Sequence, residues 1–293
     1  MPIHLDDPAA RRELRKTGYT LQHKQDTTLA KVDLHHHDFY EFYFLLSGEV
    51  TCTVESRLYR VTPGDILLIS PRELHKLHIF TSVEGYERFV LWFDMRTVKE
   101  LCSQQTDLLS CLDLAQPGHH NQLHMTPEEQ QLLYGLLRRF EQERQADAFG
   151  RDLMTRALLL QILVAVNRVA AHQEIREEDP VLTNPVISSV VEYIGTHYGQ
   201  PLTLEGLAER FFISKYHLSH EFSRFVGTSV HRYIKKKRLL TARGLMAQGK
   251  HPGEVWETCG FGDYTSFYRA FQAEYGMPPS DYANAVLLEL QSS

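Results

Sequence analysis

The sequence lacks the features by which several protein classes are recognised. Its four cysteines show no CxxC spacing, so neither a zinc ribbon nor a disulfide framework is indicated, and we expect free thiols in a reducing compartment. The N-terminal residues contain no apolar core, so no secretory signal is expected. The most apolar run, residues 157–166, is interrupted by Gln161 and is too short to cross a bilayer. These absences predict a cytoplasmic protein with no membrane partner.

An excess of basic residues is also absent. The formal net charge is -6, which by itself argues against a protein that coats nucleic acid with a uniformly basic surface. Hydrophobic residues make up 43% and charged residues 23% of the chain, a composition typical of globular proteins. With 293 residues, the chain is long enough for two domains with separate cores.

Residues from about 19 to 94 are rich in β-branched and aromatic side chains. The segments EFYFLL, VTCTVES, LYRVT, GDILLIS and ERFVLWF predict short strands separated by Gly, Pro and Asp. Many short strands with turn residues between them are typical of a β-sandwich or barrel.

Helical patterns replace the strands beyond residue 101. Thr126 to Glu129 forms a capping-box sequence with proline at the first helical position, and a second helix is predicted from about residue 151 to 172. These two helices can cover the barrel or pack against a second copy of the chain, and the sequence favours neither. The polar segment 172–180 ends in proline and is the best candidate for a linker.

The C-terminal third begins with a helix-turn-helix pattern. After a short helix capped by Thr203, Ser214 can cap a second helix, from Lys215 to about Val226. Leu218 and Phe222 fall on the inner face of that helix. A short helix, a tight turn and a second helix form the layout that enters the DNA major groove.

The same pattern recurs in residues 252–275. Gly260 supplies the turn, Asp263 the helix cap, and Phe267 and Phe271 the inner face. Between the two units a long helix is predicted over about residues 231–248. Its basic residues include Lys235, Lys236, Lys237, Arg238 and Arg243.

These segments closely resemble the DNA-binding domain of the AraC/XylS family of transcription regulators. The matching pieces are LAERFFISKYHLSHEF, the frame GTSxxxYIxxxRxxxAxxL from Gly227 to Leu245, and CGFxDxxxFxRxFxxxxGxxP. The resemblance implies seven helices, with two helix-turn-helix units joined by the long helix. It also implies that both units enter successive major grooves of double-stranded DNA, about 34 Å apart.

The resemblance further implies a set of DNA-contacting side chains, each of which can touch a phosphate or a base. This DNA-binding set is Lys215, Tyr216, Ser219, His220, Arg224, Thr265, Tyr268 and Arg269. His220 stands where the family commonly has arginine, so a guanine contact there is weakened or lost. Trp256 stands where the second unit usually has a small alanine, so we expect that unit to be repacked or its first helix to be shifted.

A second motif lies near the N-terminus, where residues 35–48 have the spacing H-x-H-x3-E-x6-G. On one strand, His35, His37 and Glu41 would point to the same side, followed by Tyr43. With the later segment PGDILLISPRELH, which ends at His75, this resembles the two motifs of the cupin barrel.

The cupin resemblance implies an internal binding site. The candidate ligand-binding residues are His35, His37, Glu41, Tyr43 and His75, and Arg88, Trp92 and His78 can also line the pocket. Four of these, His35, His37, Glu41 and His75, are the positions at which metal-binding cupins hold a divalent ion such as Zn, Fe or Mn. A small organic ligand is favoured over the metal, and no other cofactor is expected.

The predicted fold class is multidomain. It consists of an N-terminal cupin, a jelly-roll-like β-barrel with covering helices, and a C-terminal all-α domain with two helix-turn-helix units. The predicted boundaries are a sensing and dimerisation domain at 1–175 (barrel about 19–95, helices about 97–174), a linker at 176–184, and a DNA-binding domain at 185–293. Within the last, the units are predicted at about 203–226 and 252–275, joined by the helix 231–248.

These features favour a ligand-responsive transcription regulator that is not an enzyme. The expected partners are double-stranded DNA, a small effector, a second copy of the chain and RNA polymerase, and the family resemblance favours a sugar as the effector. Effector binding would alter the packing of the N-terminal arm, about residues 1–20, or of the covering helices. The alternative is a cupin metalloenzyme, an isomerase or dioxygenase, with an accessory helical domain.

The distribution of charge supports the first hypothesis. Residues 201–250 hold ten basic and three acidic side chains, a net charge of +7, whereas residues 251–293 hold one basic and six acidic, a net charge of -5. The net positive charge is thus confined to the first helix-turn-helix unit and the joining helix. We expect this region to supply most of the electrostatic affinity for DNA.

Overall fold

The computed structural model describes residues 7–26, 33–71, 73–80, 85–114, 119–173 and 182–291. The chain divides into two compact units, Met1–Leu182 and Thr183–Ser293. Most of the predicted linker at 176–184 and the first six residues of the predicted N-terminal arm lie outside the described residues.

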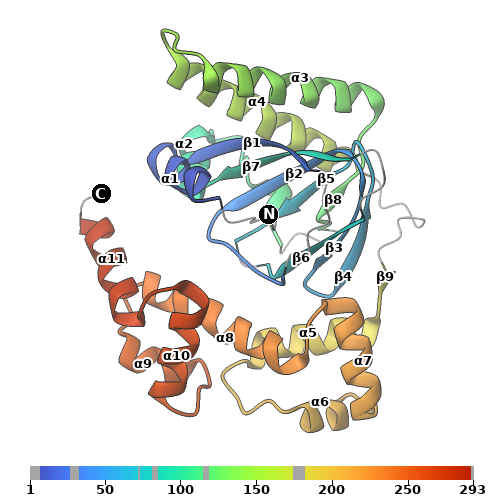
Figure 1. The fold of residues 1–293 in the computed structure, drawn as a ribbon, viewed down its shortest axis with the longest axis vertical. Coiled ribbons are helices and arrows are strands. Elements are labelled where there is room, and N and C mark those ends of the chain that lie inside the picture. The colour runs from blue at the N-terminus through green and yellow to red at the C-terminus, as the bar shows by residue number, and fades with distance from the viewer. Residues whose placement is uncertain are drawn as a thin grey trace. The chain divides into compact units, whose positions relative to one another are not determined.

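Two antiparallel sheets build the first unit (Figure 1). One has the strand order β1-β7-β2-β5-β8, and the other contains β6, β3 and β4 in this order. The strands are β1 (Tyr19–Asp26), β2 (Tyr40–Ser47), β3 (Glu49–Val54), β4 (Arg57–Val61), β5 (Ile66–Ile69), β6 (His75–Phe80), β7 (Tyr86–Phe93) and β8 (Gln122–Leu123). The predicted fold class, a β-barrel followed by an all-α domain, is confirmed.

The sheet of β1, β7 and β2 is buried on both faces, and strand alternation sorts its side chains. Phe42 and Phe44 of β2 join the cluster beneath the covering helices, while Tyr43 and Leu45 join the cluster between the two sheets. A strand buried on both sides reads as a continuous apolar run, which is why β2 has the sequence YEFYFLLS.

Helices cover both sides of this arrangement. The first unit contains α1 (Pro8–Thr17), α2 (Met95–Leu101), the 3-10 helix η1 (Ser110–Leu112), α3 (Pro127–Gln145) and α4 (Arg151–His172). The predicted capping box of Thr126 and Glu129 begins α3. Helices α3 and α4 lie over the outer face of the first sheet, whereas Ala10 and Leu14 of α1 pack into the cluster between the sheets.

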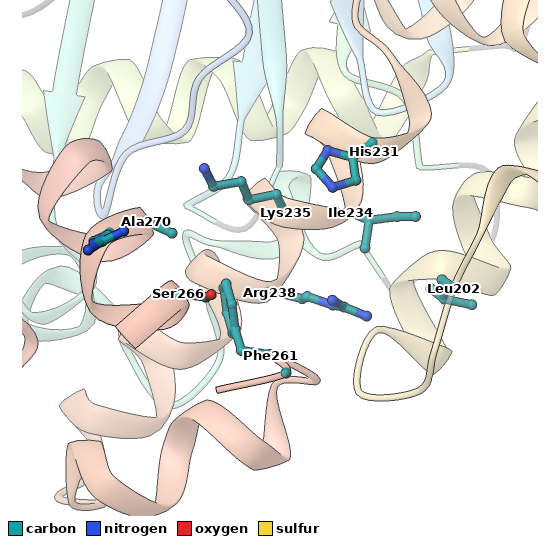
Figure 2. Close-up of a pocket in the computed structure, with 10 residues that line it drawn as sticks. Leu202, His231, Ile234, Lys235, Arg238, Phe261, Ser266 and Ala270 are labelled. Atoms are coloured by element: carbon teal, nitrogen blue, oxygen red, sulfur yellow. The ribbon is translucent and has the colours of Figure 1, made fainter. Parts of the chain in front are cut away.

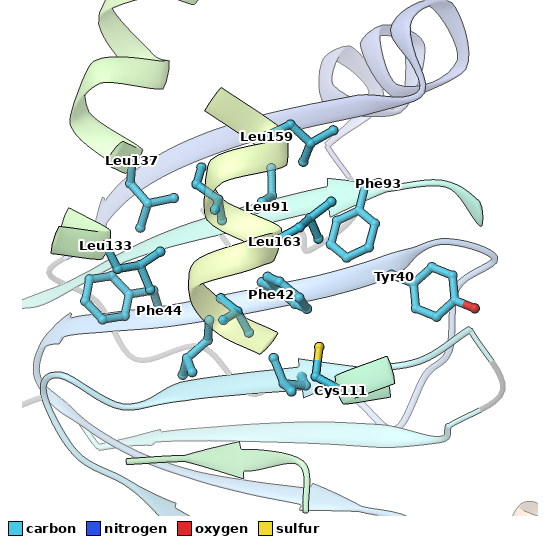
Figure 3. Close-up of a cluster of buried hydrophobic side chains, with 14 of the residues drawn as sticks. Tyr40, Phe42, Phe44, Leu91, Phe93, Cys111, Leu133, Leu137, Leu159 and Leu163 are labelled. Carbon is cyan, nitrogen blue, oxygen red and sulfur yellow. The ribbon is translucent and has the colours of Figure 1, made fainter. Parts of the chain in front are cut away.

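Helix α4 corrects one expectation. It continues for 22 residues and is long and apolar enough to cross a membrane by length and composition, so the argument from the short run 157–166 does not hold. Instead, Leu159 and Leu163 turn toward Phe42 and Phe93 of the sheet (Figure 3). Burial in the core of this unit therefore accounts for part of the apolar composition of α4, since 39% of its most apolar stretch is buried.

The second unit is helical apart from the two-residue strand β9 (Leu182–Thr183). Seven helices are described, as the family resemblance implies. They are α5 (Pro185–His197), α6 (Leu204–Arg210), α7 (Lys215–Val226), α8 (Val230–Ala247), α9 (Pro252–Thr258), α10 (Tyr264–Tyr275) and α11 (Pro279–Gln291). Helices α6 and α7 form the first helix-turn-helix unit, α9 and α10 form the second, and α8 joins them (Figure 1).

Trp256 does not occupy the centre of the second helix-turn-helix unit. Val255 of α9 and Cys259, the residue after its end, are fully buried against Phe267 and Phe271 of α10, whereas Trp256 packs at the edge of this cluster and is half-buried. The bulky ring is therefore accommodated beside the helix crossing.

Candidate functional site

Three buried titratable side chains meet in the barrel. His37, Glu41 and His75 each present a potential ligand atom, and these atoms lie within 4.8 Å of one another. Nε2 of His37 is 3.5 Å from Oε2 of Glu41, a charge contact rather than a well-formed hydrogen bond. The same oxygen accepts a hydrogen bond of 2.7 Å from Nε1 of Trp92. The structure thus brings together three of the four residues predicted as metal ligands.

Backbone carbonyls assign the tautomers of both imidazoles. Nδ1 of His37 lies 2.7 Å from the carbonyl oxygen of Phe39, and Nδ1 of His75 lies 3.1 Å from that of Glu73. Because a carbonyl only accepts hydrogen bonds, each Nδ1 carries a proton. Nε2 of the neutral His75 therefore presents a lone pair, and it has no hydrogen-bond partner within the described part of the chain. Nε2 of His37 faces Glu41 instead, so one buried acceptor, on His75, faces the interior.

The surroundings of this cluster shift its pKa values. Burial lowers the pKa of His75 well below its ordinary value, and the nearby His35 and His37 lower it further. Burial alone would raise the pKa of Glu41, but His37, His35 and the indole N–H of Trp92 together hold the pKa of that carboxyl below its usual value. At neutral pH the cluster presents a neutral His75 and an ionised Glu41.

His35 does not join the cluster in the predicted way. Strand β2 begins only at Tyr40, so His35, His37 and Glu41 are not on one strand, and the expectation that they share a strand face is wrong. The chain bends before β2, and the backbone of His35 pairs with that of His75. Its ring centroid is 4.2 Å from that of His75, while its Nδ1 lies 2.9 Å from the carbonyl oxygen of Asp33.

The remaining predicted pocket residues divide into interior and surface positions. Tyr43 is buried and its hydroxyl is hydrogen-bonded to that of Tyr86, with burial raising the pKa of Tyr43 well above its ordinary value. Trp92 and Arg88 of β7 also turn into the interior, whereas His78 is exposed.

Strand β1 supplies interior polar residues that the sequence analysis did not single out. Gln22 and Lys24 pair with Val90 and Arg88 of β7, so they share the inner face of the sheet. Residues 22–26 are all polar, so the sequence shows no alternation that distinguishes the inner face of this strand from the outer one.

Helix α7 presents the first set of predicted DNA contacts. Ser214 caps the helix by accepting a hydrogen bond from the backbone N–H of His217 at 3.1 Å. All the predicted contact residues of α7 are exposed, and Tyr216 and His220 stack at a centroid distance of 6.3 Å. The exposed predicted residues are Lys215, Tyr216, Ser219, His220 and Arg224.

Acidic neighbours offset part of the positive charge on α7. Nζ of Lys215 lies 3.1 Å from Oε1 of Glu205 in α6. Glu221 lies 3.1 Å from Nδ1 of His220 and 3.7 Å from Nη1 of Arg224. Because the basic partners in these contacts are exposed, water and salt screen the contacts, and a phosphate can compete for the cations.

Helix α10 presents the second set. Asp263 caps it by accepting a hydrogen bond of 2.7 Å from the backbone N–H of Ser266. Thr265 and Arg269 are exposed, whereas Tyr268 is half-buried and its ring lies near that of Tyr264, with centroids 6.3 Å apart. Tyr268 is therefore the least accessible of the predicted contacts.

A basic cleft lies between α8 and α10. It encloses about 480 Å³, and Figure 2 shows His231, Lys235 and Arg238 of α8 on one side and Ser266 of α10 on another. Arg269 also lines it. Arg238 donates hydrogen bonds to the carbonyl oxygens of Tyr198 and Gln200 at 2.9 Å each, so it holds the preceding loop in place.

The basic run on α8 is divided between structure and surface. Lys236 is buried and pairs with Glu274 of α10, and Arg243 stacks over the ring of Tyr275. Lys235 instead lines the cleft and makes no ion pair with the described residues. The helical periodicity of the sequence does not by itself distinguish the buried Lys236 from Lys235, which lines the cleft.

Comparisons with known proteins agree with this arrangement. A helix-turn-helix domain family matches residues 207–285, and an AraC-like ligand binding domain family matches residues 18–163. The HTH-type transcriptional activator RhaS of Salmonella arizonae is 24% identical over 249 residues, covering 84% of this chain and 86% of RhaS. RhaS of Salmonella typhimurium matches with the same identity and coverage.

Two groups of solved structures are also similar. ToxT from Vibrio cholerae has a TM-score of 0.39 and 12% identity, with 91% of this chain and 98% of that chain covered. The DNA-binding domain of AdpA in complex with a target DNA has a TM-score of 0.36 and 22% identity, with 38% of this chain and 100% of that chain covered.

The first unit is a barrel with polar side chains in its interior, and the second unit exposes two recognition helices. Together these two features define a ligand-responsive transcription regulator. The two family matches fall on these two parts of the chain in the same order. The chain belongs to the AraC family of transcription regulators, as its C-terminal motifs predicted.

Proposed function

We propose that this regulator binds a sugar or another small polar metabolite inside the barrel and thereby changes its affinity for a specific DNA sequence. One observation carries the proposal: the chain that exposes α7 and α10 also buries Nε2 of His75, which lacks a hydrogen-bond partner among the described residues, beside the ionised Glu41. Buried acceptors without partners are costly, so a ligand that donates to them would be bound tightly.

The ligand would contact the residues that meet in the barrel. One hydroxyl group of the effector donates to Nε2 of His75, another donates to Glu41, and His37 lies beside them against Glu41. Tyr43 and His35 border this site. Because α1 packs into the same apolar cluster through Ala10 and Leu14, a ligand that changes the cluster also changes the seating of α1. The effector must favour one seating over another for regulation to follow.

On DNA, we propose that α7 and α10 enter two successive major grooves. The exposed side chains of α7 and the pair Thr265 and Arg269 contact base edges and phosphates, with a smaller contribution from the half-buried Tyr268. Lys235 and His231 in the basic cleft contact the sugar–phosphate backbone between the two grooves. The chain would act in the cytoplasm, without catalysis, and would recruit or exclude RNA polymerase.

The chain would function as a homodimer. A cleft of about 620 Å³ between α3 and α4 is lined mainly by apolar side chains, including Leu132, which is exposed, and Leu136. A second copy would cover this surface. Sedimentation of Leu132→Lys should show a monomer, whereas Leu153→Lys, an exposed leucine of α4 outside the cleft, should remain dimeric. Two dimeric variants would contradict this interface.

A gel-shift titration tests the central proposal. The full chain is mixed with the DNA upstream of its own gene and with a scrambled duplex of the same length, with and without candidate sugars. We expect a salt-sensitive shift of the natural duplex only, which Arg269→Ala weakens and Arg57→Ala in the barrel does not. No sequence-dependent shift under any ligand condition would contradict the function.

A metal-dependent role for the barrel is the second candidate, and the cluster of His37, Glu41 and His75 favours it. Two imidazoles and a carboxylate are ligands suited to Zn or Fe, although the 4.8 Å spread exceeds the separation of about 3.4 Å between ligand atoms in a tetrahedral zinc site. Elemental analysis of the purified chain should give stoichiometric metal that is lost in His37→Ala. Metal-free protein that still responds to sugars would exclude this candidate.

A further inference from the structure

Arg88 is a buried cation, and one edge of its guanidinium group makes no hydrogen bond with the described residues. It lies on β7 with 1% of its surface exposed, its Nη1 pairs with Asp26, and its guanidinium carbon lies 4.0 Å from the centre of the Tyr86 ring. Neither Nε nor Nη2 has a hydrogen-bond partner anywhere in the part of the chain that the structure describes. Burying charged donors without acceptors is costly, so this edge of the guanidinium requires an explanation.

The unused atoms form a recognisable binding edge. The N–H of Nε and one N–H of Nη2 are parallel and lie on the same side of the planar guanidinium group. A carboxylate has two oxygens at the matching separation and accepts both hydrogen bonds at once, which a single hydroxyl cannot do. The free edge therefore favours a planar anion, which adds charge attraction to the two hydrogen bonds, over the neighbouring hydroxyls of a neutral sugar.

A second buried group without partners lies on the same face of the sheet. Both amide atoms of Gln22 lack hydrogen-bond partners among the described residues, although the side chain is buried. Gln22 is opposite Val90 and Lys24 is opposite Arg88, so Gln22 and Arg88 are diagonal neighbours across β1 and β7. Diagonal neighbours are about 7–8 Å apart at the backbone, a distance that two long side chains can span to reach one ligand.

The local charges leave room for an anion. Asp26 pairs with Arg88, while Nζ of Lys24, the residue opposite Arg88, lies 3.9 Å from Asp7, and the charges of Asp26 and Glu41 also act on Lys24. Asp7 is also the N-cap of α1, so the contact that balances Lys24 belongs to the helix that packs over the interior. An anion bound at Arg88 would compete with Asp7 for Lys24.

We propose that Arg88 and Gln22 form an anchoring subsite for a carboxylate, so that the effector is a small hydroxylated organic acid rather than a neutral sugar. The carboxylate accepts from Nε and Nη2 of Arg88, and Gln22 hydrogen-bonds an adjacent oxygen. This inference rests on the proposed ligand-sensing function and narrows the chemical class of its ligand. It also links the subsite to α1 through Lys24 and Asp7.

Thermal unfolding of the full chain tests the proposal. The protein is titrated with sodium acetate, lactate, gluconate and galacturonate, each against sodium chloride at equal ionic strength, and with neutral glucose and galactose. We expect at least one acid to raise the melting temperature above that in chloride, because a ligand that binds only the folded chain stabilises it. If no acid does so, the proposal is overturned.

Two variants connect the effect to the subsite. Arg88→Lys keeps a cation beside Asp26 but removes the parallel donors, and it should weaken binding of the acid by about tenfold or more. Gln22→Leu removes the unpartnered amide without leaving a buried charge, and a similar loss is expected. Arg60→Lys, the same substitution at an exposed arginine of β4, is the matched control and should bind like the unmodified chain.

The possible results separate the two proposals. Unchanged acid binding in both Arg88→Lys and Gln22→Leu overturns the subsite, and if Arg88→Lys does not fold, Gln22→Leu alone decides. A melting temperature raised by the neutral sugars but by none of the acids overturns the carboxylate subsite while leaving the ligand-sensing function intact.

Discussion

The two helix-turn-helix units of the second domain have the same architecture but different surfaces and cores. Both place a side-chain cap before the second helix, Ser214 in α7 and Asp263 in α10, and both bury phenylalanines on its inner face. Residues 201–250, with the first unit and α8, have a net charge of +7, while residues 251–293, with the second, have -5. Both units therefore keep the helix caps and the apolar inner face that form the motif, whereas their net charges differ and can be adapted to function.

Both turns contain a residue in the left-handed conformation, but the residue type at that position differs. Phe212 in the first turn has a φ of 55° and is almost fully exposed, whereas Gly260 in the second has a φ of 77°. A Cβ at Gly260 would lie 2.8 Å from the carbonyl oxygens of Tyr198 and Gly199, which excludes any other residue there. Because the side chain of Phe212 extends into solvent, the first turn tolerates a bulky residue in a left-handed conformation at some conformational cost.

The largest expected effect comes from exchanging the residues at the helix crossings. Ala208 is buried where α6 meets α7, so Ala208→Trp should destabilise the first unit by about 3 kcal/mol or more through overpacking. Trp256→Ala removes a half-buried ring at the edge of the second core and should cost about 1 kcal/mol. Amide hydrogen exchange of α7 and α10 in the full chain measures both effects. Equal losses would mean that the two crossings are packed alike.

A smaller effect is expected on sequence reading. Arg269→Ala should cost about 1–3 kcal/mol of binding and relax the preference at a single base pair, since an exposed arginine on α10 can contact guanine. Binding to a series of operators with single-base substitutions measures this. Uniform weakening across all operators would instead show that Arg269 contacts a phosphate and that the second unit is less specific than proposed.

Two neighbouring lysines separate electrostatic from structural roles. Lys235→Gln should lower the slope of log K against log salt by about 0.9, because the cleft residue releases one counterion when it meets DNA. Lys236→Gln should leave that slope unchanged and destabilise the second domain, because Lys236 is buried against Glu274. DNA binding at several salt concentrations distinguishes them. Identical slopes in both variants and the unmodified chain would contradict the assignment of the cleft.

The smallest expected difference concerns the response of the caps to acid. Hydrogen bonds from Ser266 hold the pKa of Asp263 below its ordinary value. The cap therefore stabilises the second unit fully above the ordinary carboxyl pKa, and this stabilisation is lost as the pH falls through the lowered value. Ser214 does not titrate, so the cap of α7 is retained, and α7 should lose only what Glu205 and Glu221, whose pKa values are also lowered, contribute. Hydrogen exchange of α10 and α7 over that pH range, repeated with Asp263→Ser, should show the difference disappear in the variant.

Much of this architecture could be predicted from local patterns. Ser214, Asp263 and Thr126 were identified as helix caps because capping depends on residues only three positions apart, and all three accept the expected backbone hydrogen bonds. The short aromatic and apolar run of β2 indicated a strand in the same local way. Such features depend on neighbours in the sequence, so they are visible without the fold.

The binding sites depended on contacts between distant segments. The set of His35, His37 and Glu41 was expected on one strand, but a bend before Tyr40 instead brings His37 and Glu41 together with His75 of β6. The inward-facing polar residues of β1 could not be recognised because residues 22–26 are polar on both faces of the strand. Only the pairing of β1 with β7 turns Gln22 inward beside Arg88.

The sequence alone determined that this chain joins a β-barrel to two helix-turn-helix units, and that its net positive charge is concentrated in residues 201–250. The tertiary structure decided which polar groups are buried without partners and which lysine of the basic run remains available for DNA. The physical reason is that spacing along an element determines which side chains share a face, whereas burial is determined by what packs on that face.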